Sequence, residues 1–169
     1  MIVKVHIEKD LRRLNALYNA SIASSSSDDP VYYSKLAVLE FSGWVEESFD
    51  AIALRAAKGK LKTAKFQNIL KEVVKKNSGF TYDNHFLSML SKVVGLPACE
   101  KLHREMDSDG SIAILRAELD AVVQQRNKAA HINLANTTVS FDTPSIYLGR
   151  QGRLNKVYPV LRKMYSQFC

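Results

Sequence analysis

The segment from Gln124 to His131 concentrates the side chains best suited to chemistry. Its last six residues include an arginine, an amide, a lysine and a histidine: Arg126, Asn127, Lys128 and His131. A histidine titrates near neutral pH and can transfer protons, whereas an arginine pairs bidentately with phosphate oxygens and stays charged. These residue types together indicate chemistry on a phosphodiester.

These side chains fall at the end of an apolar helix predicted over residues 112–131. Asn127 and His131 are four residues apart and share a face, while Arg126 lies about 140° from His131 around the axis and reaches it through a long side chain. The small Ala129–Ala130 pair predicts a low surface that a second helix or a phosphate can approach closely. The alternative stays open that Arg126 and His131 only occupy a helix end, where positive charge is favoured.

The run Arg126-Asn127-Lys128-Ala129-Ala130-His131 resembles the signature of HEPN domains. In that family an arginine, a polar residue and, after a short spacing, a histidine close a helix of an all-α bundle. The resemblance extends to a short non-helical link after the histidine and one last amphipathic helix. Ile132 and Asn133 follow the histidine here, where family members often have a glycine.

The resemblance implies a metal-independent endoribonuclease without a cofactor, of the kind found as toxins or effectors in bacterial conflict systems. It implies that Arg126 holds the scissile phosphate and that His131 transfers a proton, with Asn127 orienting the site and Lys128 adding charge. The 2′-hydroxyl that attacks is present in RNA and absent from DNA. The implied partners are RNA, a second copy of the chain that completes a composite site, and an antitoxin, either a nucleotidyltransferase or a small protein.

Two alternatives belong to other classes. One is a non-catalytic HEPN-like module that binds RNA or a partner protein, with the basic segments mattering more than Arg126 and His131. The other is a purely structural helical subunit.

Glu40 is the only charged residue between Lys35 and Glu46, inside an apolar stretch. An unpaired buried carboxylate is costly, so two interpretations stay open. Glu40 either lies on a narrow exposed strip of its helix, or it faces Arg126 or His131 and tunes the pKa of that residue. Trp44, one turn later, is interpreted as a core anchor in preference to a platform for base stacking.

The best local pair of metal ligands is Cys99 and His103, four residues apart on one helix face. Two ligands do not make a zinc site. We therefore predict no metal site, with Cys99 a small core thiol beside a surface imidazole.

The net charge of +7 comes from two basic blocks on a mildly acidic chain. Residues 55–76 hold eight basic residues and one acidic residue, and residues 144–169 hold five basic residues and no acidic one. Each block predicts either a polyanion-binding surface or a solvated helix face. The candidate RNA-binding residues among them are Lys58, Lys60, Lys62, Lys65, Arg150 and Arg153.

The elements that must position these residues are helices. With 7 Gly and 4 Pro in 169 residues, a turn-rich all-β architecture is disfavoured. Apolar spacing and start and stop signals predict helices over residues 6–22, 30–58, 61–76, 83–94 and 112–131, with a short helical piece over 97–106. The helix of residues 61–76 is expected to turn its apolar residues inward, and Asp83 is expected to cap the helix that follows. Asp142-Thr143-Pro144 is a further start signal. An extended connector is predicted over 137–141, and a final helix is predicted through Leu154 to Phe168, begun or kinked near Pro159.

The prediction is one all-α domain over residues 1–169, a HEPN-like bundle of five or six helices around the helix of residues 30–58. Two cysteines form no disulfide framework, which favours a reducing compartment. No signal-peptide pattern and no apolar run of membrane-spanning length is seen, so we expect a cytoplasmic protein without membrane contact.

Overall fold

The computed structural model describes residues 2–24, 29–131, 140–148 and 153–168, and all of its regular elements in these ranges are helical. In chain order they are α1 (Lys4–Ala23), α2 (Asp29–Ala57), α3 (Ala64–Lys75), the π-helix η1 (Tyr82–Leu87), α4 (Ser88–Val94), α5 (Leu96–Asp107), α6 (Ser111–His131), α7 (Pro144–Leu148) and α8 (Arg153–Ser166). The all-α prediction is confirmed.

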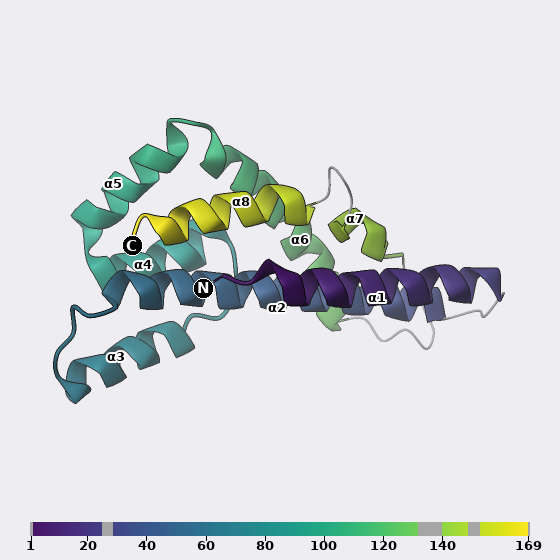
Figure 1. Cartoon of the computed structure of the whole chain (residues 1–169), viewed down its shortest axis with the longest axis horizontal. Coiled ribbons are helices and arrows are strands. Elements are labelled where there is room, and N and C mark those ends of the chain that lie inside the picture. The colour runs from purple at the N-terminus through teal and green to yellow at the C-terminus, as the bar shows by residue number, and fades with distance from the viewer. Residues whose placement is uncertain (1, 25–28, 132–139, 149–152, 169) are drawn as a thin grey trace.

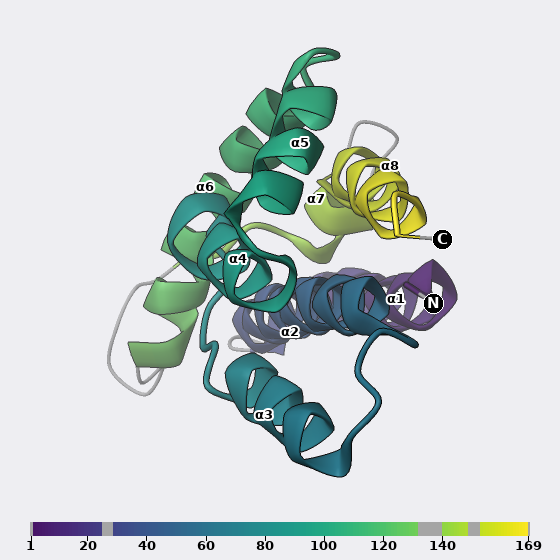
Figure 2. The same cartoon turned by 90° about the vertical axis from the view of Figure 1, so that its left-hand side faces the viewer.

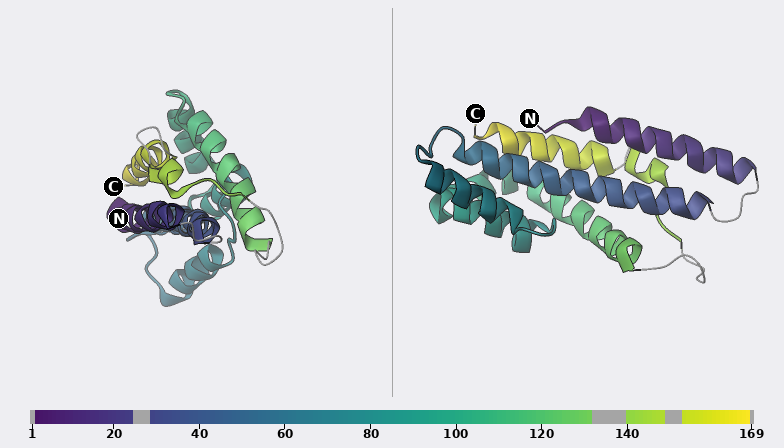
Figure 3. Two further views of the ribbon diagram at one scale, coloured as in Figure 1. Left: turned by 90° about the vertical axis from the view of Figure 1, so that its right-hand side faces the viewer. Right: turned by 90° about the horizontal axis from the view of Figure 1, so that it is seen from below.

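Helix α2 is the central element, as its apolar sequence predicts. It packs against α1, which lies antiparallel beside it, and also against α3, α4, α6, α7 and α8 (Figures 1 and 3). Its bounds, Asp29–Ala57, agree with the predicted 30–58, and Gly59 follows with a positive φ of 75°. A helix surrounded on most sides must be apolar on most sides, which is what residues 36–45 provide.

Aromatic side chains from distant segments meet along α2. Phe41 and Tyr147 are fully buried with ring centroids 5.2 Å apart, and Phe49 stacks on Phe86 at 4.4 Å. Trp44 is 8% exposed and donates its indole N–H to the carbonyl oxygen of Val3 at 3.0 Å. Trp44 is thus a core anchor.

The described residues hold more helices than the five or six predicted, because η1 precedes α4 and the short α7 precedes α8 as separate elements. Gly95, with a φ of 82°, separates α4 from α5, and the start signal at Pro144 begins the five-residue α7. The last helix begins at Arg153, six residues before Pro159. The extended connector predicted over 137–141 lies mostly outside the described residues; Ser140 and Phe141 have no regular secondary structure.

The segment after Thr81 is a π-helix rather than the start of an ordinary helix capped by Asp83. The Phe86 N–H donates to the Thr81 carbonyl at 3.1 Å, an i→i+5 bond. Asp83 makes no cap; its carboxylate accepts hydrogen bonds from Nε and Nη2 of Arg116 on α6, at 2.9 and 2.6 Å. A π turn inside a helix is uncommon and is frequent at functional sites.

Helix α3 lies at the edge of the molecule, where it packs against α2 and α4 (Figure 2). Its apolar residues were predicted to face inward, but only Val74 is buried. Phe66 is 56% exposed and Ile69 is 47% exposed. The prediction that Phe66 and Ile69 face the core is wrong. Amphipathic spacing shows that a helix has an apolar face, but it does not show that another part of the same chain covers that face.

None of the described helices combines the length and the apolar character that crossing a membrane requires.

Candidate functional site

Arg126 lines a cavity of about 290 Å³ between three helices and a loop. Helix α2 contributes Glu46, η1 contributes His85, and α6 contributes Val123, Arg126 and Asn127. The loop before η1 supplies Ser78, Gly79, Phe80 and Thr81. A guanidinium, an imidazole, an amide and a carboxylate are thereby placed around one space by segments far apart in the sequence.

The imidazole of His85 is held in a defined orientation by Thr81. The backbone N–H of Thr81 donates to Nδ1 of His85 at 3.3 Å, and the Thr81 hydroxyl oxygen lies 2.6 Å from the same nitrogen. A backbone N–H can only donate, so Nδ1 is an acceptor and the neutral ring carries its proton on Nε2. Sequence reasoning missed this residue, whose neighbours Thr81 and Gly79 give no motif.

Gly79 is required beside this imidazole. A β-carbon at position 79 would lie 2.6 Å from Nε2 of His85 and 2.7 to 2.8 Å from the adjacent ring carbons, closer than side chains pack. Its φ of 126° is also one that residues with a β-carbon rarely adopt. Glycine therefore lets the backbone of this loop pack closely against the His85 ring.

Of the predicted catalytic pair, only Arg126 lies in this cavity. Arg126 is half-buried and its Nη1 donates to the side-chain oxygen of Asn127 at 3.4 Å. His131 is the last residue of α6 and is exposed. Asn127 lines the cavity and His131 follows it by one turn on the same face, about 6 Å further along the axis. A ligand that extends from the cavity along α6 would reach His131.

The low alanine surface predicted beside the motif is wrong in part. Ala129 is fully buried and belongs to the core, whereas Ala130 is exposed. Ala129 follows the buried Val122 by seven residues and so shares the core-facing side of α6, whereas Ala130 lies about 100° further around the helix.

Lys128 makes structural contacts at the end of α6. Its Nζ donates to the Ser140 carbonyl at 2.8 Å and lies 5.5 Å from the centre of the Phe141 ring. Lys128 thereby holds Ser140 and Phe141 against the end of α6. The predicted role of Lys128, adding charge to the site, did not include this structural contact.

Glu40 and Arg126 line different spaces. Glu40 is exposed and borders a cavity of about 250 Å³ between α1 and α2, together with His6 and Asp10. The exposed-strip interpretation of Glu40 agrees with this placement. The carboxylate in the Arg126 cavity is Glu46, which lies about 120° around α2 from Glu40.

Asp50, one turn after Glu46, is half-buried, and burial, with the carboxylates of Glu46 and Glu47, raises its pKa to about 6. Its unfolded pKa is 3.8, so between about pH 4 and pH 6 the native chain binds a proton that the unfolded chain has released, and stability falls as pH rises through this window.

We therefore expect Asp50→Asn to raise the free energy of unfolding near pH 7 by about 1–2 kcal/mol, after discounting for partial exposure. Below about pH 4 both side chains are neutral and the difference should vanish. Urea denaturation followed by circular dichroism across this range measures it. A stability difference that is the same at every pH would contradict the assignment.

The two basic blocks differ in how much of their charge is available. Four exposed lysines of the first block lie at the start of α3 and in the turn before it: Lys58, Lys60, Lys62 and Lys65. The Arg126 cavity lies near the opposite end of α3, where Ser78 lines it. In the second block, Lys156 pairs with Glu118 at 2.9 Å and Lys163 pairs with Asp109. Arg150 lies outside the described residues, and Arg153 is the first residue of α8.

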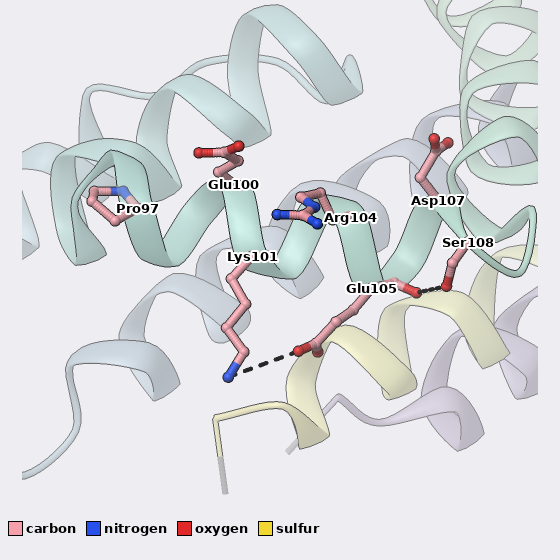
Figure 4. Close-up of a pocket in the computed structure, with 7 residues that line it drawn as sticks. All are labelled: Pro97, Glu100, Lys101, Arg104, Glu105, Asp107 and Ser108. Atoms are coloured by element: carbon pink, nitrogen blue, oxygen red, sulfur yellow. Dashed lines mark hydrogen bonds and ion pairs between the residues drawn. The ribbon is translucent and has the colours of Figure 1, made fainter.

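A groove of about 730 Å³ lies on the outer face of α5. All of its lining residues belong to α5 or to Ser108 immediately after it, and their side chains spread along one helix (Figure 4). Opposite charges there lie next to one another: Lys101 pairs with Glu105 at 3.9 Å. No convergent set of side chains faces a ligand, so this groove carries less chemistry than the smaller Arg126 cavity.

Cys99 and His103 border another cavity, of about 480 Å³. His103 shares a hydrogen bond with the Tyr82 hydroxyl, Nδ1 to oxygen 3.0 Å, and burial raises the pKa of the Cys99 thiol. Across the described ranges, no three His, Cys, Asp or Glu side chains converge as metal ligands would.

The Arg126 cavity has the groups needed to bind an anionic oxygen and a hydroxyl group together. The guanidinium and the Nε2–H of His85 are donors suited to phosphate oxygens, while the Glu46 carboxylate accepts a hydrogen bond from a hydroxyl. Searches of protein-family models, of curated proteins and of solved structures find no significant match to this chain.

Proposed function

We propose that this protein is a metal-independent endoribonuclease of the HEPN type that acts as a homodimer, as a toxin or effector restrained by an antitoxin. The observation that supports it best is the position of Arg126, half-buried in a cavity that ends one turn before the exposed His131. The resemblance of Arg126 to His131 to the family signature supplies the reaction.

In the proposed reaction the ribose 2′-oxygen attacks the adjacent phosphorus, and the bond from phosphorus to the 5′-oxygen breaks. The proton of the 2′-hydroxyl goes to a base, and the leaving 5′-oxygen takes a proton from an acid. His131 is the side chain proposed for proton transfer, and Arg126 stabilises the charge that develops on the phosphate oxygens. The products are a 2′,3′-cyclic phosphate and a 5′-hydroxyl.

His131 lies outside the cavity that holds Arg126, so a second chain is proposed to complete the site. An exposed helix end is well placed to meet the same end of a second copy around a twofold axis. In such a composite site, Arg126 of one chain and His131 of the other act on the same phosphate.

The test is cleavage of a defined RNA in excess EDTA, with analysis of the product ends. We expect cleavage to 2′,3′-cyclic phosphate ends, and we expect His131→Ala to lower the rate by about 100-fold or more. His6→Ala, which removes an exposed histidine on α1, is the matched control and should cleave as the unsubstituted protein does.

Mixing provides the test of the dimer. When His131→Ala and Arg126→Ala chains exchange subunits, a site built across two chains regains one intact arginine and one intact histidine, so activity should return in part. Mixtures that stay inactive while light scattering shows exchanged dimers would contradict the composite site. Absolute dependence on a metal ion would contradict the mechanism.

A non-catalytic RNA-binding module is the second candidate, favoured by the exposed lysines around α3. Binding of RNA that weakens steeply with salt, with no cleavage of the bound strand, would favour this candidate over the nuclease.

A further inference from the structure

The imidazole of His85 is placed with unusual constraint for a residue outside the predicted motif. Thr81 occupies Nδ1 with two hydrogen-bonding groups, and the backbone of Gly79 packs closely against the part of the ring that contains Nε2. The ring nitrogen that remains for a ligand is therefore Nε2, which in the neutral ring is a donor. The same imidazole lines the cavity that contains Arg126.

The charges around the cavity limit which ligand it can take. Arg126 and His85 supply donors for an anion, whereas Glu46 would repel a ligand that is anionic on every side. A ligand with an anionic part and a hydroxyl group satisfies all three side chains. A volume of about 290 Å³ lies at the lower limit for small-molecule sites, which suits a phosphate with its sugar better than a longer strand.

We infer that this cavity binds one ribose phosphate group, with Arg126 and Nε2–H of His85 on the phosphate oxygens and the Glu46 carboxylate accepting a hydrogen bond from a sugar hydroxyl. His85 is then a substrate-binding residue whose orientation depends on Thr81 and Gly79. The ligand class rests on the proposed ribonuclease function; the donor and acceptor arrangement rests on the geometry of the cavity.

The probe is uridine 3′-monophosphate, which has the phosphate and the 2′-hydroxyl but no leaving group and so cannot be cleaved. Nitrogen-15 spectra of the histidine rings should show His85 protonated at Nε2, and its Nε2 signal should move when the nucleotide is added. Inorganic phosphate and the 2′-deoxy nucleotide should bind at least about tenfold more weakly if Glu46 receives the hydroxyl.

Two substitutions of His85 separate its donor from its contact with Thr81. His85→Asn keeps a polar group near the position of Nδ1 and loses Nε2, so it should fold and bind the nucleotide at least about tenfold more weakly. His85→Gln carries an amide close to the position of Nε2 and should recover part of the binding. His103→Asn is the matched control, because His103 borders the cavity with Cys99 instead.

Binding that is unchanged in His85→Asn, a His85 signal that ignores the nucleotide, or a ring protonated at Nδ1 would each overturn the inference. These readouts do not require cleavage. If the nucleotide binds at His85 while no RNA is cleaved, the site stands and the nuclease proposal fails; if RNA is cleaved equally by His85→Asn, the nuclease stands and this inference fails.

Discussion

Arg126→Ala is expected to lower the rate of RNA cleavage by about a thousandfold, because charge on the phosphate oxygens rises in the transition state and the Arg126 guanidinium lines the cavity. Arg126→Lys should recover only a small part of the rate. A lysine keeps the charge, but it lacks the planar pair of donors that matches two phosphate oxygens. Single-turnover cleavage of a labelled RNA in EDTA measures both variants.

The loss must come from chemistry and not from unfolding. Arg126 is half-buried and its described hydrogen bond runs to its neighbour Asn127, so removing it should change the free energy of unfolding by less than about 1 kcal/mol. Arg104→Ala, an exposed arginine on α5, is the matched control and should keep the full rate. Full activity of purified Arg126→Ala would show that the cavity is not where cleavage takes place.

Phe49→Ala has the largest expected effect on stability, a loss of about 3–5 kcal/mol in the free energy of unfolding. The ring of Phe49 is fully buried on α2 and stacks on Phe86 of η1 at 4.4 Å, so its removal leaves a cavity between two helices. For a chain of 169 residues this corresponds to a fall of roughly 10 °C in Tm. Urea and thermal denaturation measure the two quantities.

Phe66→Ala is the matched control for Phe49→Ala, since it deletes the same ring from α3, where Phe66 is 56% exposed. The expected change is within about 0.5 kcal/mol. An equal loss in both variants would mean that α3 packs far more closely than its exposure indicates. Phe86 directly follows His85 in η1 and stacks on Phe49. Phe49→Ala should therefore also weaken nucleotide binding at His85.

The helices could be predicted because their signals are local. The apolar run around Phe41 and the stop at Gly59 define α2 to within one residue at each end. The exposure of Phe66 on α3 could not be predicted, since an apolar face is compatible with any covering partner. The π turn at Tyr82–Leu87 could not be predicted either, because it depends on how Phe86 packs against Phe49 and Asp83 pairs with Arg116.

One half of the candidate site could be found in the sequence and the other could not. Arg126 belongs to a local pattern on one helix and was predicted. His85 lies 41 residues before it on another helix, and Glu46 comes from a third, so their meeting depends on tertiary packing. Glu40 was singled out because of its apolar neighbours, with an exposed strip or a place facing Arg126 or His131 as the two alternatives, and its position on α2 directs it to the cavity shared with α1.

The hydrogen bond between Trp44 and Val3 makes the chain its own optical probe. Trp44 is the only tryptophan in the sequence, and its indole N–H donates to a carbonyl immediately before α1 while its ring lies beside Phe41 and Tyr158. Intrinsic tryptophan emission from this protein therefore reports one place, where the N-terminal end of α1 meets the middle of α2. A shift of that emission to longer wavelength marks water reaching the indole when this junction opens, without any label.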